Sequence, residues 1–245
     1  MIALIDGDIV AYRCSASCKE ADPLEISCIR TDRLLSDILQ EVEADKYKIF
    51  LSGGSNFRYD IYPEYKANRK DKPRPVHLQS TREFMINEWN AELCDGIEAD
   101  DALGIHQDQI GPYEPPHEGE YKTVICSIDK DLLQIPGLHW NFVKKEWADI
   151  SSIQGLRNFY KQLLLGDRTD NIPGFDGKMR TKLPKFLEFN YYQLDSLENE
   201  WDMYDYLVTI YAGDKETLFR NAQLLYIQRE ENDKWNPPEK LELEV

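Results

Sequence analysis

Acidic side chains gather directly after two apolar segments that are predicted to be strands. Asp6 and Asp8 follow residues 2–5, and Asp129 and Asp131 follow residues 122–128. Because the carboxyl ends of parallel strands meet at one edge of a sheet, we expect the two pairs to lie close together. Two further acidic groups stand at a predicted helix start and in a Gly-Asp-x-x-Asp turn: Glu98, Asp100 and Asp101, then Asp167 and Asp170.

Each acidic group taken alone has an ordinary structural explanation. Acids at helix starts cap backbone N–H groups, and acids in turns accept hydrogen bonds from their own backbone. Four groups on one edge are harder to explain in this way, because packed carboxylates repel one another unless cations neutralise them. Such ligands suit Mg²⁺ or Mn²⁺, and two ions about 3.5–4 Å apart can clamp the attacking and leaving oxygens of a phosphodiester. The pattern therefore predicts a two-metal hydrolytic site.

A basic segment complements the acids. Between Lys66 and Arg82 there are six basic residues and one acid, Asp71. Lys66 and Arg69 are three residues apart, so on a helix they would share a face and could hold a scissile phosphate. Tyr65 beside them could stack on a base. Alone, this segment would be explained as a solvated basic face. A role in phosphate binding is inferred only because the acidic groups are also present.

Apolar periodicity predicts an α/β scaffold for these residues. Strands are predicted at 2–5, 47–52, 122–128 and 138–143. Helices are predicted at 31–43 with Thr31 as a cap, from Ser80 with Glu83 at capping-box spacing, and from near Asp100. After residue 150 the pattern is helical, over 152–165, 181–190, 201–212 and 214–227. We expect a mostly parallel central sheet flanked by helices over residues 1–150, and a helical C-terminal lobe over 151–245.

Composition excludes several classes of protein. The 245 residues are 42 % apolar and 30 % charged, which excludes a disordered or fibrous chain. No apolar run approaches the roughly 20 residues that span a bilayer. The run 2–5 has neither a basic flank nor a cleavage site, so we expect no signal peptide, a cytoplasmic protein and reduced thiols at all five cysteines.

The net charge of −16 taken alone disfavours a nucleic-acid partner, because phosphate contacts need Lys and Arg. Its distribution changes that conclusion. Basic residues are concentrated in the segment from Lys66 to Arg82, and four more lie between Lys178 and Lys185 without an acid among them. Such a chain could hold an anionic polymer on one face and repel it elsewhere.

Five motifs in order resemble the 5′-nuclease family, which comprises flap endonucleases, the 5′–3′ exonuclease domains of bacterial repair polymerases and phage 5′–3′ exonucleases. They are the runs 4–7 (Leu-Ile-Asp-Gly), 62–69 (Tyr-Pro-Glu-Tyr-Lys-Ala-Asn-Arg), 96–102 (Gly-Ile-Glu-Ala-Asp-Asp-Ala), 127–131 (Ser-Ile-Asp-Lys-Asp) and 166–174 (Gly-Asp-Arg-Thr-Asp-Asn-Ile-Pro-Gly). The resemblance covers about three quarters of the chain. Each motif alone would be a weak signal, and their shared order is specific.

The resemblance implies a PIN-like sheet, a helix-three-turn-helix element that grips duplex DNA, and metal-activated water attacking a phosphodiester near a 5′ end. Asp6, Glu98, Asp100 and Asp129 match one metal cluster, and Asp101, Asp131, Asp167 and Asp170 match the second group of acids. Lys66 and Arg69 match a phosphate-steering pair, and Tyr65 a stacking position. Further DNA contacts are expected from Lys70, Lys178, Arg180 and Lys182. Implied cofactors are two Mg²⁺ or Mn²⁺ ions, with K⁺ as an additional candidate.

The chain departs from the family pattern at three places. One is the basic, Pro-containing segment between Lys66 and Glu98, whose 31 residues suit a short arch or an open gateway. Ser52 stands where an Asp is usual, and serine is a poor metal ligand, which bears on metal affinity. After residue 174 a second glycine-rich turn is usual, and it helps to bind K⁺. Here Gly177 remains but Met179 replaces the next glycine, so Lys178, Arg180 and Lys182 are expected to take over some backbone contacts to phosphate.

Several functions stay open at the level of sequence. The leading hypothesis is a 5′–3′ exonuclease or flap endonuclease acting on DNA with a 5′ end, flap or nick, or on an RNA–DNA hybrid, in replication or repair. A PIN-like ribonuclease would use the same acids. A phosphatase with Asp6 as nucleophile and Asp8 as acid would leave the basic motif unexplained. A DNA-structure binder that has lost cleavage would explain Ser52. A monomer with a replication-protein partner and no membrane contact is expected, in a host cytoplasm if the chain is phage-encoded.

Overall fold

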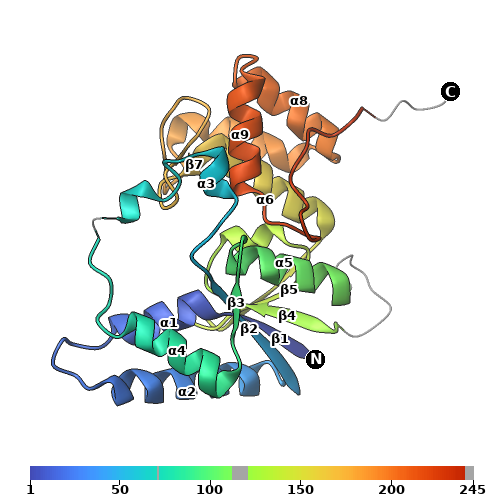
Figure 1. Cartoon of the computed structure of the whole chain (residues 1–245). Helices are drawn as coiled ribbons and strands as arrows, with labels where there is room; N and C mark the ends of the chain where they lie inside the picture. Colours follow the sequence, from blue (N-terminus) through green and yellow to red (C-terminus); the bar gives the residue numbers. More distant parts are fainter. Residues whose placement is uncertain (71, 112–120, 241–245) are drawn as a thin grey trace. The chain divides into compact units, whose positions relative to one another are not determined.

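The computed structural model describes residues 1–70, 72–111 and 121–240. Its main sheet has the strand order β3-β2-β1-β4-β5-β6 (Figure 1). The strands are β1 (Ile2–Asp6), β2 (Lys46–Ser52), β3 (Glu92–Cys94), β4 (Thr123–Cys126), β5 (Gly137–Asn141) and β6 (Glu146–Ile150). The first five are parallel, and β6 pairs antiparallel with β5. The expected mostly parallel sheet flanked by helices is confirmed, with β1 at its centre.

Alternating side chains of the central strands bury the two faces of the sheet under different helices. Ala3 and Ile5 of β1 join a core cluster with residues of α1 (Gly7–Ala16), α2 (Leu24–Glu41) and α4 (Leu78–Trp89). Leu4 between them points to the other face, where α5 (Ala99–Ile110) contributes Leu103. Successive strand residues point to opposite faces, so a strand buried on both sides is apolar throughout. This explains why residues 2–5 carry no polar alternation.

Helices and short elements make up the rest of the chain. They are α3 (Arg58–Ile61), η1 (Ala67–Arg69), η2 (Asp131–Gln134), α6 (Ser152–Leu165), β7 (Gly166–Asp167), β8 (Ile172–Pro173), η3 (Lys185–Leu187), α7 (Glu188–Gln193), η4 (Leu194–Ser196), α8 (Glu200–Ile210) and α9 (Lys215–Leu225). A separate core cluster forms where α6, α8 and α9 bury apolar residues together, among them Leu163, Leu207 and Ala222. Because each of these helices carries an apolar stripe, they stabilise one another by packing rather than by propensity alone.

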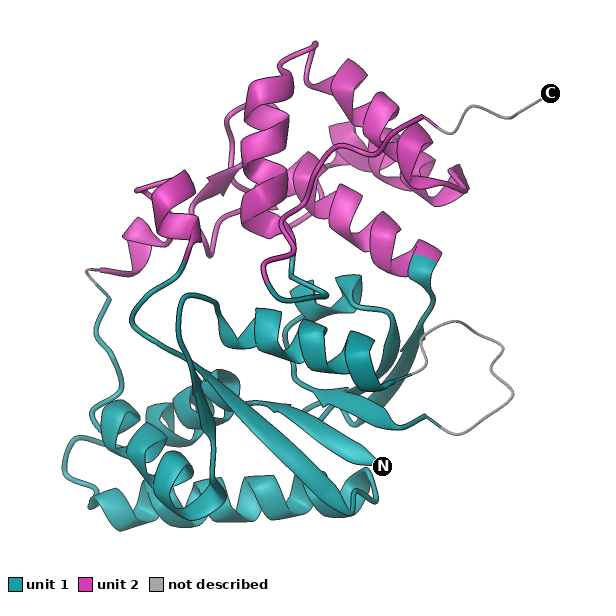
Figure 2. Ribbon diagram, turned by 45° about the vertical axis from the view of Figure 1, so that its right-hand side comes forward, with its two compact units in different colours: residues 1–56, 72–152, 227–231 teal, residues 57–71, 153–226, 232–245 magenta. Residues whose placement is uncertain are grey.

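The chain divides into two compact units (Figure 2). Unit 1 comprises residues 1–56, 72–152 and 227–231, and unit 2 comprises 57–71, 153–226 and 232–245. One crossing, after residue 152, lies close to the boundary expected at residue 150. The expected domains 1–150 and 151–245 do not include two further points at which the chain passes from one unit to the other. The segment 57–71 carries the basic motif into unit 2, and the segment 227–231 returns to unit 1.

Three predicted helix starts need correction. The helix predicted at 31–43 begins at Leu24, and Thr31 is no cap because its hydroxyl donates to the Ser27 carbonyl inside the helix. The helix predicted from Ser80 begins at Leu78. The helix predicted at 181–190 begins only at Lys185, because Pro184 lacks an N–H and disfavours helical backbone before it. The helix-three-turn-helix element of this region stays a prediction.

None of the helices in the described residues is long and apolar enough to cross a membrane. None of the five cysteines, all of which lie in described parts of the chain, is placed in a disulfide, and their reduced state stays a prediction from the sequence. Burial raises the pKa of the Cys94 thiol to about 12, so this thiol stays protonated and unreactive near neutral pH.

A buried histidine is expected to make unit 1 sensitive to acid. The His139 ring is buried on β5, with its Nε2 2.7 Å from the Ile135 carbonyl oxygen, and burial lowers its pKa from 6.5 to about 4. Between about pH 4 and 6.5, His139 is protonated in the unfolded chain but neutral in the folded chain. The free energy of unfolding therefore falls as pH falls through this range, by up to about 3 kcal/mol. Urea unfolding of the wild type and of His139→Leu at pH 7.5 and pH 5 isolates this loss as the difference between the two proteins, because the buried Asp6 carboxyl titrates over the same range with the opposite effect on stability. An unchanged pH dependence in the variant would contradict it.

Candidate functional site

The carboxyl ends of β1 and β4 meet at one edge of the sheet in unit 1, as the sequence predicts. Asp6 ends β1 and also caps α1, where its carboxylate accepts the Ile9 N–H at 3.1 Å. The Ser127 hydroxyl donates to the same carboxylate at 2.7 Å, and Ser127 Oγ accepts the Asp129 N–H at 3.0 Å. A chain of hydrogen bonds therefore connects Asp6 to Asp129 through Ser127. Sequence reasoning did not single out Ser127, although it stands in the motif 127–131.

Asp6 is buried among other acids. Burial raises the pKa of its carboxyl group to about 7, the negative charges of Asp8 and Asp129 raise it further, and the bonds from Ser127 and Ile9 oppose the rise. A carboxylate in this environment gains from a nearby cation, which would hold it in the ionised form. Hard oxygen donors at such a position fit a divalent ion such as Mg²⁺ or Mn²⁺.

The acids of this edge do not form a finished metal cage. Within residues 1–70, 72–111 and 121–240, no three His, Cys, Asp or Glu side chains are arranged to hold a metal ion. The oxygen donors of this edge fit a hard cation by their chemistry and by their place at the strand ends, and holding one would require the side chains to approach one another.

The acids near α5 divide into two kinds. Glu98 caps α5 and forms a capping box with Asp101, whose carboxylate accepts the Glu98 N–H at 3.0 Å. The other oxygen of Asp101 accepts the Gln228 N–H at 3.1 Å, so this fully buried acid connects the helix start to the segment 227–231. Asp100 lies between them and is partly exposed. The capping box engages both Glu98 and Asp101, Asp101 also accepts the Gln228 N–H, and Asp100 stands in the same first turn of α5.

Asp129 and Asp131 share one turn after β4. The Asp131 N–H donates to the Asp129 carboxylate at 2.9 Å, and Asp131 opens the short helix η2. Side chains that bond to the backbone two residues later favour such turns. Both acids are positioned by the end of the same strand, as the sequence predicts.

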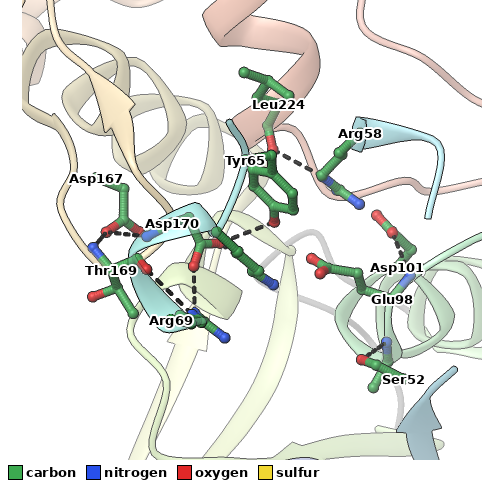
Figure 3. Close-up of polar contacts among 12 residues, drawn as sticks. Ser52, Arg58, Tyr65, Arg69, Glu98, Asp101, Asp167, Thr169, Asp170 and Leu224 are labelled. Carbon is green, nitrogen blue, oxygen red and sulfur yellow. Dashed lines mark hydrogen bonds and ion pairs between the residues drawn. The ribbon is translucent and has the colours of Figure 1, made fainter. Parts of the chain in front are cut away.

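Ser52 has a positioning role that sequence reasoning missed. Its hydroxyl oxygen accepts the Ala99 N–H at 2.9 Å (Figure 3), which is one of the unpaired amides at the start of α5. Its own N–H donates to Asp8 at 3.0 Å. Arg82 of α4 donates to both the Asp8 carboxylate and the Ser52 carbonyl. No short-range pattern could have revealed this cluster, because its members come from α1, β2, α4 and α5.

Removing the Ser52 hydroxyl is expected to destabilise unit 1. Ser52→Ala leaves the Ala99 amide without its acceptor, which should lower the free energy of unfolding by about 1–2 kcal/mol. Urea unfolding of the metal-free protein measures this change, and Ser36→Ala on the exposed side of α2 is the matched control. Equal free energies of unfolding for the two variants would show that the hydrogen bond between Ser52 and the Ala99 N–H does not stabilise the fold.

The basic motif converges on one carboxylate within unit 2. The Tyr65 hydroxyl donates to Asp170 at 2.9 Å, and the Arg69 guanidinium forms an ion pair with the same carboxylate (Figure 3). The Lys66 ammonium lies 3.6 Å from it. Sequence spacing predicts Lys66 and Arg69 on one helical face. They do face the same group, but through a different geometry, because the 3₁₀-helix η1 begins only after Lys66.

Backbone contacts hold the motif against the turn between β7 and β8. The Lys66 N–H donates to the Asp170 carbonyl at 2.9 Å, and the Asn171 amide donates to the Glu64 carbonyl at 2.8 Å. Asp167 shapes this turn by accepting the N–H groups of Thr169 and Asp170 (Figure 3). Asp167 and Asp170 thus lie in unit 2 with the basic motif, while the other predicted acids lie in unit 1.

The predicted stacking role of Tyr65 needs correction. Its side chain is only 2 % exposed and belongs to the core cluster of unit 2, with the Tyr59 ring 5.6 Å away. A ring enclosed in this way offers no face to a base. Its hydroxyl instead positions Asp170. Lys66 next to it adopts φ +55°, which is uncommon for a residue with a side chain and marks a backbone position under strain.

The other predicted DNA contacts lie at the surface of unit 2. Lys70, Lys178 and Lys182 are exposed. Arg180 differs, because its guanidinium donates to both oxygens of Asp176 and holds the pKa of that carboxyl group below its usual range. Arg58 is a further basic residue with a structural role. Its buried guanidinium donates to the Leu224 carbonyl near the end of α9 (Figure 3) and to the carbonyl of Tyr226, which follows the helix.

Comparison with known proteins agrees with the motifs. The model of the "5′-3′ exonuclease, N-terminal resolvase-like domain" family matches residues 1–160. The chain therefore belongs to the 5′–3′ exonuclease family. The 5′–3′ exonuclease of Buchnera aphidicola subsp. Acyrthosiphon pisum is 31 % identical over 196 residues, covering 75 % of this chain and 63 % of that protein. DNA polymerase I of Chloroflexus aurantiacus is 27 % identical over 208 residues, covering 72 % of this chain and 21 % of the polymerase. This chain thus spans about three fifths of the exonuclease relative and about a fifth of the polymerase.

A solved structure shares the fold. The bacteriophage T5 flap endonuclease, in a pseudo-enzyme-product complex with DNA and metal ions, matches with a TM-score of 0.64 and 17 % identity. The match covers 91 % of this chain and 88 % of that one. The arrangement of sheet and helices is therefore that of a known nuclease fold.

Proposed function

We propose that this chain is a divalent-metal-dependent 5′ nuclease, a 5′–3′ exonuclease or flap endonuclease, that hydrolyses phosphodiesters near 5′ ends of DNA in replication or repair. The observation that carries the proposal is the Asp6–Ser127–Asp129 edge in a chain of this family. The Asp6 carboxylate caps α1, but a cap does not require burial beside the acids Asp8 and Asp129 at paired strand ends, and this environment suits a cation.

Within this proposal the acids of unit 1 form the metal-binding set. Asp6, Glu98, Asp100, Asp129 and Asp131 would hold the ions, and Asp101 would position the start of α5. The ions, when bound, lower the pKa of a water molecule and neutralise charge on the phosphodiester. Mg²⁺ or Mn²⁺ fits these oxygen donors, and the metal ions in the T5 structure support the assignment. K⁺ at the turn near Met179 remains an expectation of the sequence.

Lys66 and Arg69 would bind the scissile phosphate and stabilise the charge that develops on it. The Asp170 carboxylate orients both cations before DNA binds, which reduces the entropy lost on ordering two long side chains. We therefore assign Asp170 to positioning Lys66 and Arg69, with Asp167 shaping the turn. This departs from the role of metal ligand that the resemblance implies for these two acids.

The alternative functions gain less support. A phosphatase with Asp8 as its acid is disfavoured because Asp8 is engaged by Arg82 and by the Ser52 N–H. The binder hypothesis rests on Ser52 as a lost metal ligand. The Ser52 hydroxyl accepts the Ala99 N–H and so has a structural role. This role explains the serine without a loss of catalytic activity. A PIN-like ribonuclease would use the same acids and differs in its substrate.

The partners follow from the same proposal. DNA with a 5′ end, flap or nick is the expected substrate, and the DNA in the T5 structure supports it. An RNA–DNA hybrid substrate, a replication-protein partner, a monomeric state and a cytoplasmic location stay predictions from the sequence.

Cleavage of a duplex with a 5′-labelled flap tests the function. We expect short labelled products with Mg²⁺ or Mn²⁺, none with EDTA, and a loss of at least about a hundredfold in Asp131→Asn. Asp195→Asn in the exposed part of unit 2 is the matched control and should cleave normally. The lengths of the products separate exonuclease from flap cleavage. Tight flap binding without products in either metal would contradict the proposal and favour a DNA-structure binder.

A further inference from the structure

Three aromatic side chains of unit 2 are exposed along one short segment. Phe186 is 66 % exposed, Phe189 is 74 % exposed and Tyr192 is 60 % exposed. They recur every three residues through η3 and α7, a spacing that keeps side chains near one face of a helical segment. The opposite side of the same segment is anchored, because Leu187 and Leu194 are buried in the core of unit 2.

This outward aromatic row lies next to basic side chains. The Arg180 guanidinium lies over the Phe186 ring, 5.6 Å from its centroid, and over the Phe175 ring at 5.8 Å. Arg180 therefore places the basic loop 178–182 beside the row. Lys178, Lys182 and Lys185 of this region are exposed, while Asp176 is occupied by Arg180. The only acid within the row itself is Glu188.

Exposed rings beside exposed lysines suit one kind of ligand better than others. A protein partner that covers phenylalanines need not be polyanionic, whereas single-stranded nucleic acid offers base faces and phosphates in alternation. A duplex offers phosphates but keeps its base faces inside the helical stack. The charge of this region thus complements an anionic chain, in a protein whose net charge of −16 repels one elsewhere.

We propose that the face formed by Phe186, Phe189 and Tyr192 binds single-stranded DNA, with bases stacked on the rings and phosphates held by Lys178, Lys182 and Lys185. This deepens the proposed function, because it names the unpaired strand of the substrate as the ligand of unit 2. Arg180 keeps the loop beside the rings through Asp176 and contributes a cation over Phe186. The rings need no base-specific contacts, so binding tolerates any sequence.

Binding measurements in EDTA test this inference without cleavage. The probes are a labelled 20-nucleotide single strand of thymidylate and a blunt duplex of equal length, followed by fluorescence anisotropy. Phe186→Ala with Phe189→Ala should weaken single-strand binding by about tenfold per ring, and about a hundredfold together, because stacking contributes about 1–3 kcal/mol per base. Duplex binding should change by less than about threefold. Trp147→Ala, which removes an exposed ring of β6 in unit 1, is the matched control and should leave both affinities unchanged.

Two further variants separate stacking from folding and charge. Phe189→Trp keeps a stacking ring, so it should retain single-strand affinity, and its fluorescence should fall as the oligonucleotide binds. Lys178→Ala with Lys182→Ala should reduce the slope of log affinity against log salt by about 0.7 per lysine, and the Phe186→Ala, Phe189→Ala variant should keep the wild-type slope.

Three outcomes would overturn the inference. They are unchanged single-strand binding in the Phe186→Ala, Phe189→Ala variant, an equal loss for duplex, and a dimer in sedimentation that this variant converts to a monomer with DNA binding intact. The last would assign the face to a second copy of the chain. Because the assay is run without metal, a protein inactive in the flap assay can still confirm single-strand binding, so failures of the two proposals are distinguishable.

Discussion

Asp6→Asn is expected to reduce flap cleavage by at least about a thousandfold and, at the same time, to stabilise the metal-free protein. The loss of activity follows because Asp6 is the most buried carboxylate of the proposed metal set, and the ions supply several kcal/mol of transition-state stabilisation. The gain in stability follows from the raised pKa of about 7, which records the cost of holding a charge at this position. Function and stability are thus opposed at this residue.

The stabilisation expected from Asp6→Asn depends on pH. Between the ordinary pKa of 3.8 and about 7, the folded chain holds a proton that the unfolded chain has lost, so this group makes stability fall as pH rises. The penalty is complete above pH 7 and absent below pH 4. At pH 8 in EDTA, urea unfolding of Asp6→Asn should show a free energy roughly 4 kcal/mol above that of the wild type.

A matched control completes this experiment. Asp37→Asn on the exposed side of α2 should alter neither stability nor cleavage. Asn at position 6 can still accept the Ile9 N–H, so the α1 cap is retained. A destabilised Asp6→Asn protein would mean that the carboxylate serves the fold, and the assignment of this edge to a metal would lose its main support.

Lys66→Met is expected to lower the single-turnover cleavage rate by about a hundredfold to a thousandfold, the range seen when one preorganised donor to a developing negative charge is removed. The physical reason is the pairing of Lys66 with Asp170, which holds the ammonium in place before substrate arrives. Substrate affinity should change by less than about threefold, because one phosphate contact among many adds little to binding. Single-turnover quench-flow with saturating enzyme separates the two effects.

The strained backbone at Lys66 allows a second variant. Lys66→Gly should lose the same activity but unfold at higher temperature, since glycine adopts φ +55° without the steric cost that a side chain incurs. Lys215→Met at the start of α9 is the control for removing a positive charge from unit 2. Cleavage retained in both Lys66 variants would contradict the role of this residue.

The sequence is sufficient to predict β1, β2, β4 and β5 and the acids that follow β1 and β4, but it does not predict the short strand β3 or the antiparallel strand β6. Residues 2–5 are uniformly apolar because β1 is buried on both faces, and this makes the strand and its terminal Asp6 recognisable. The same logic applies to β4 and Asp129. Parallel pairing of β1 with β4 then brings the two acids to one edge without any further information.

Long-range contacts explain what the sequence does not reveal. The polar residues around Tyr65 in the sequence suggest an exposed side chain. In the structure Tyr65 is buried, because the segment 57–71 belongs to unit 2 and Tyr65 packs into its core. The role of Ser52 depends on Ala99, which lies 47 residues later. Thr31 in the interior of α2 shows that a residue type common at caps does not by itself mark a helix start. Pro184 is a local signal that apolar periodicity alone overlooks, because it restricts the backbone before η3.

The central claim is that the carboxylate edge formed by β1, β4 and α5 holds the catalytic divalent ions. Diffraction from crystals grown with Mn²⁺, recorded for its anomalous signal, tests this most directly. We predict an anomalous peak within coordination distance of Asp6 and Asp129, and its loss in crystals of Asp6→Asn. An active protein whose Mn²⁺ lies away from both residues, or is unaffected by Asp6→Asn, would contradict the claim.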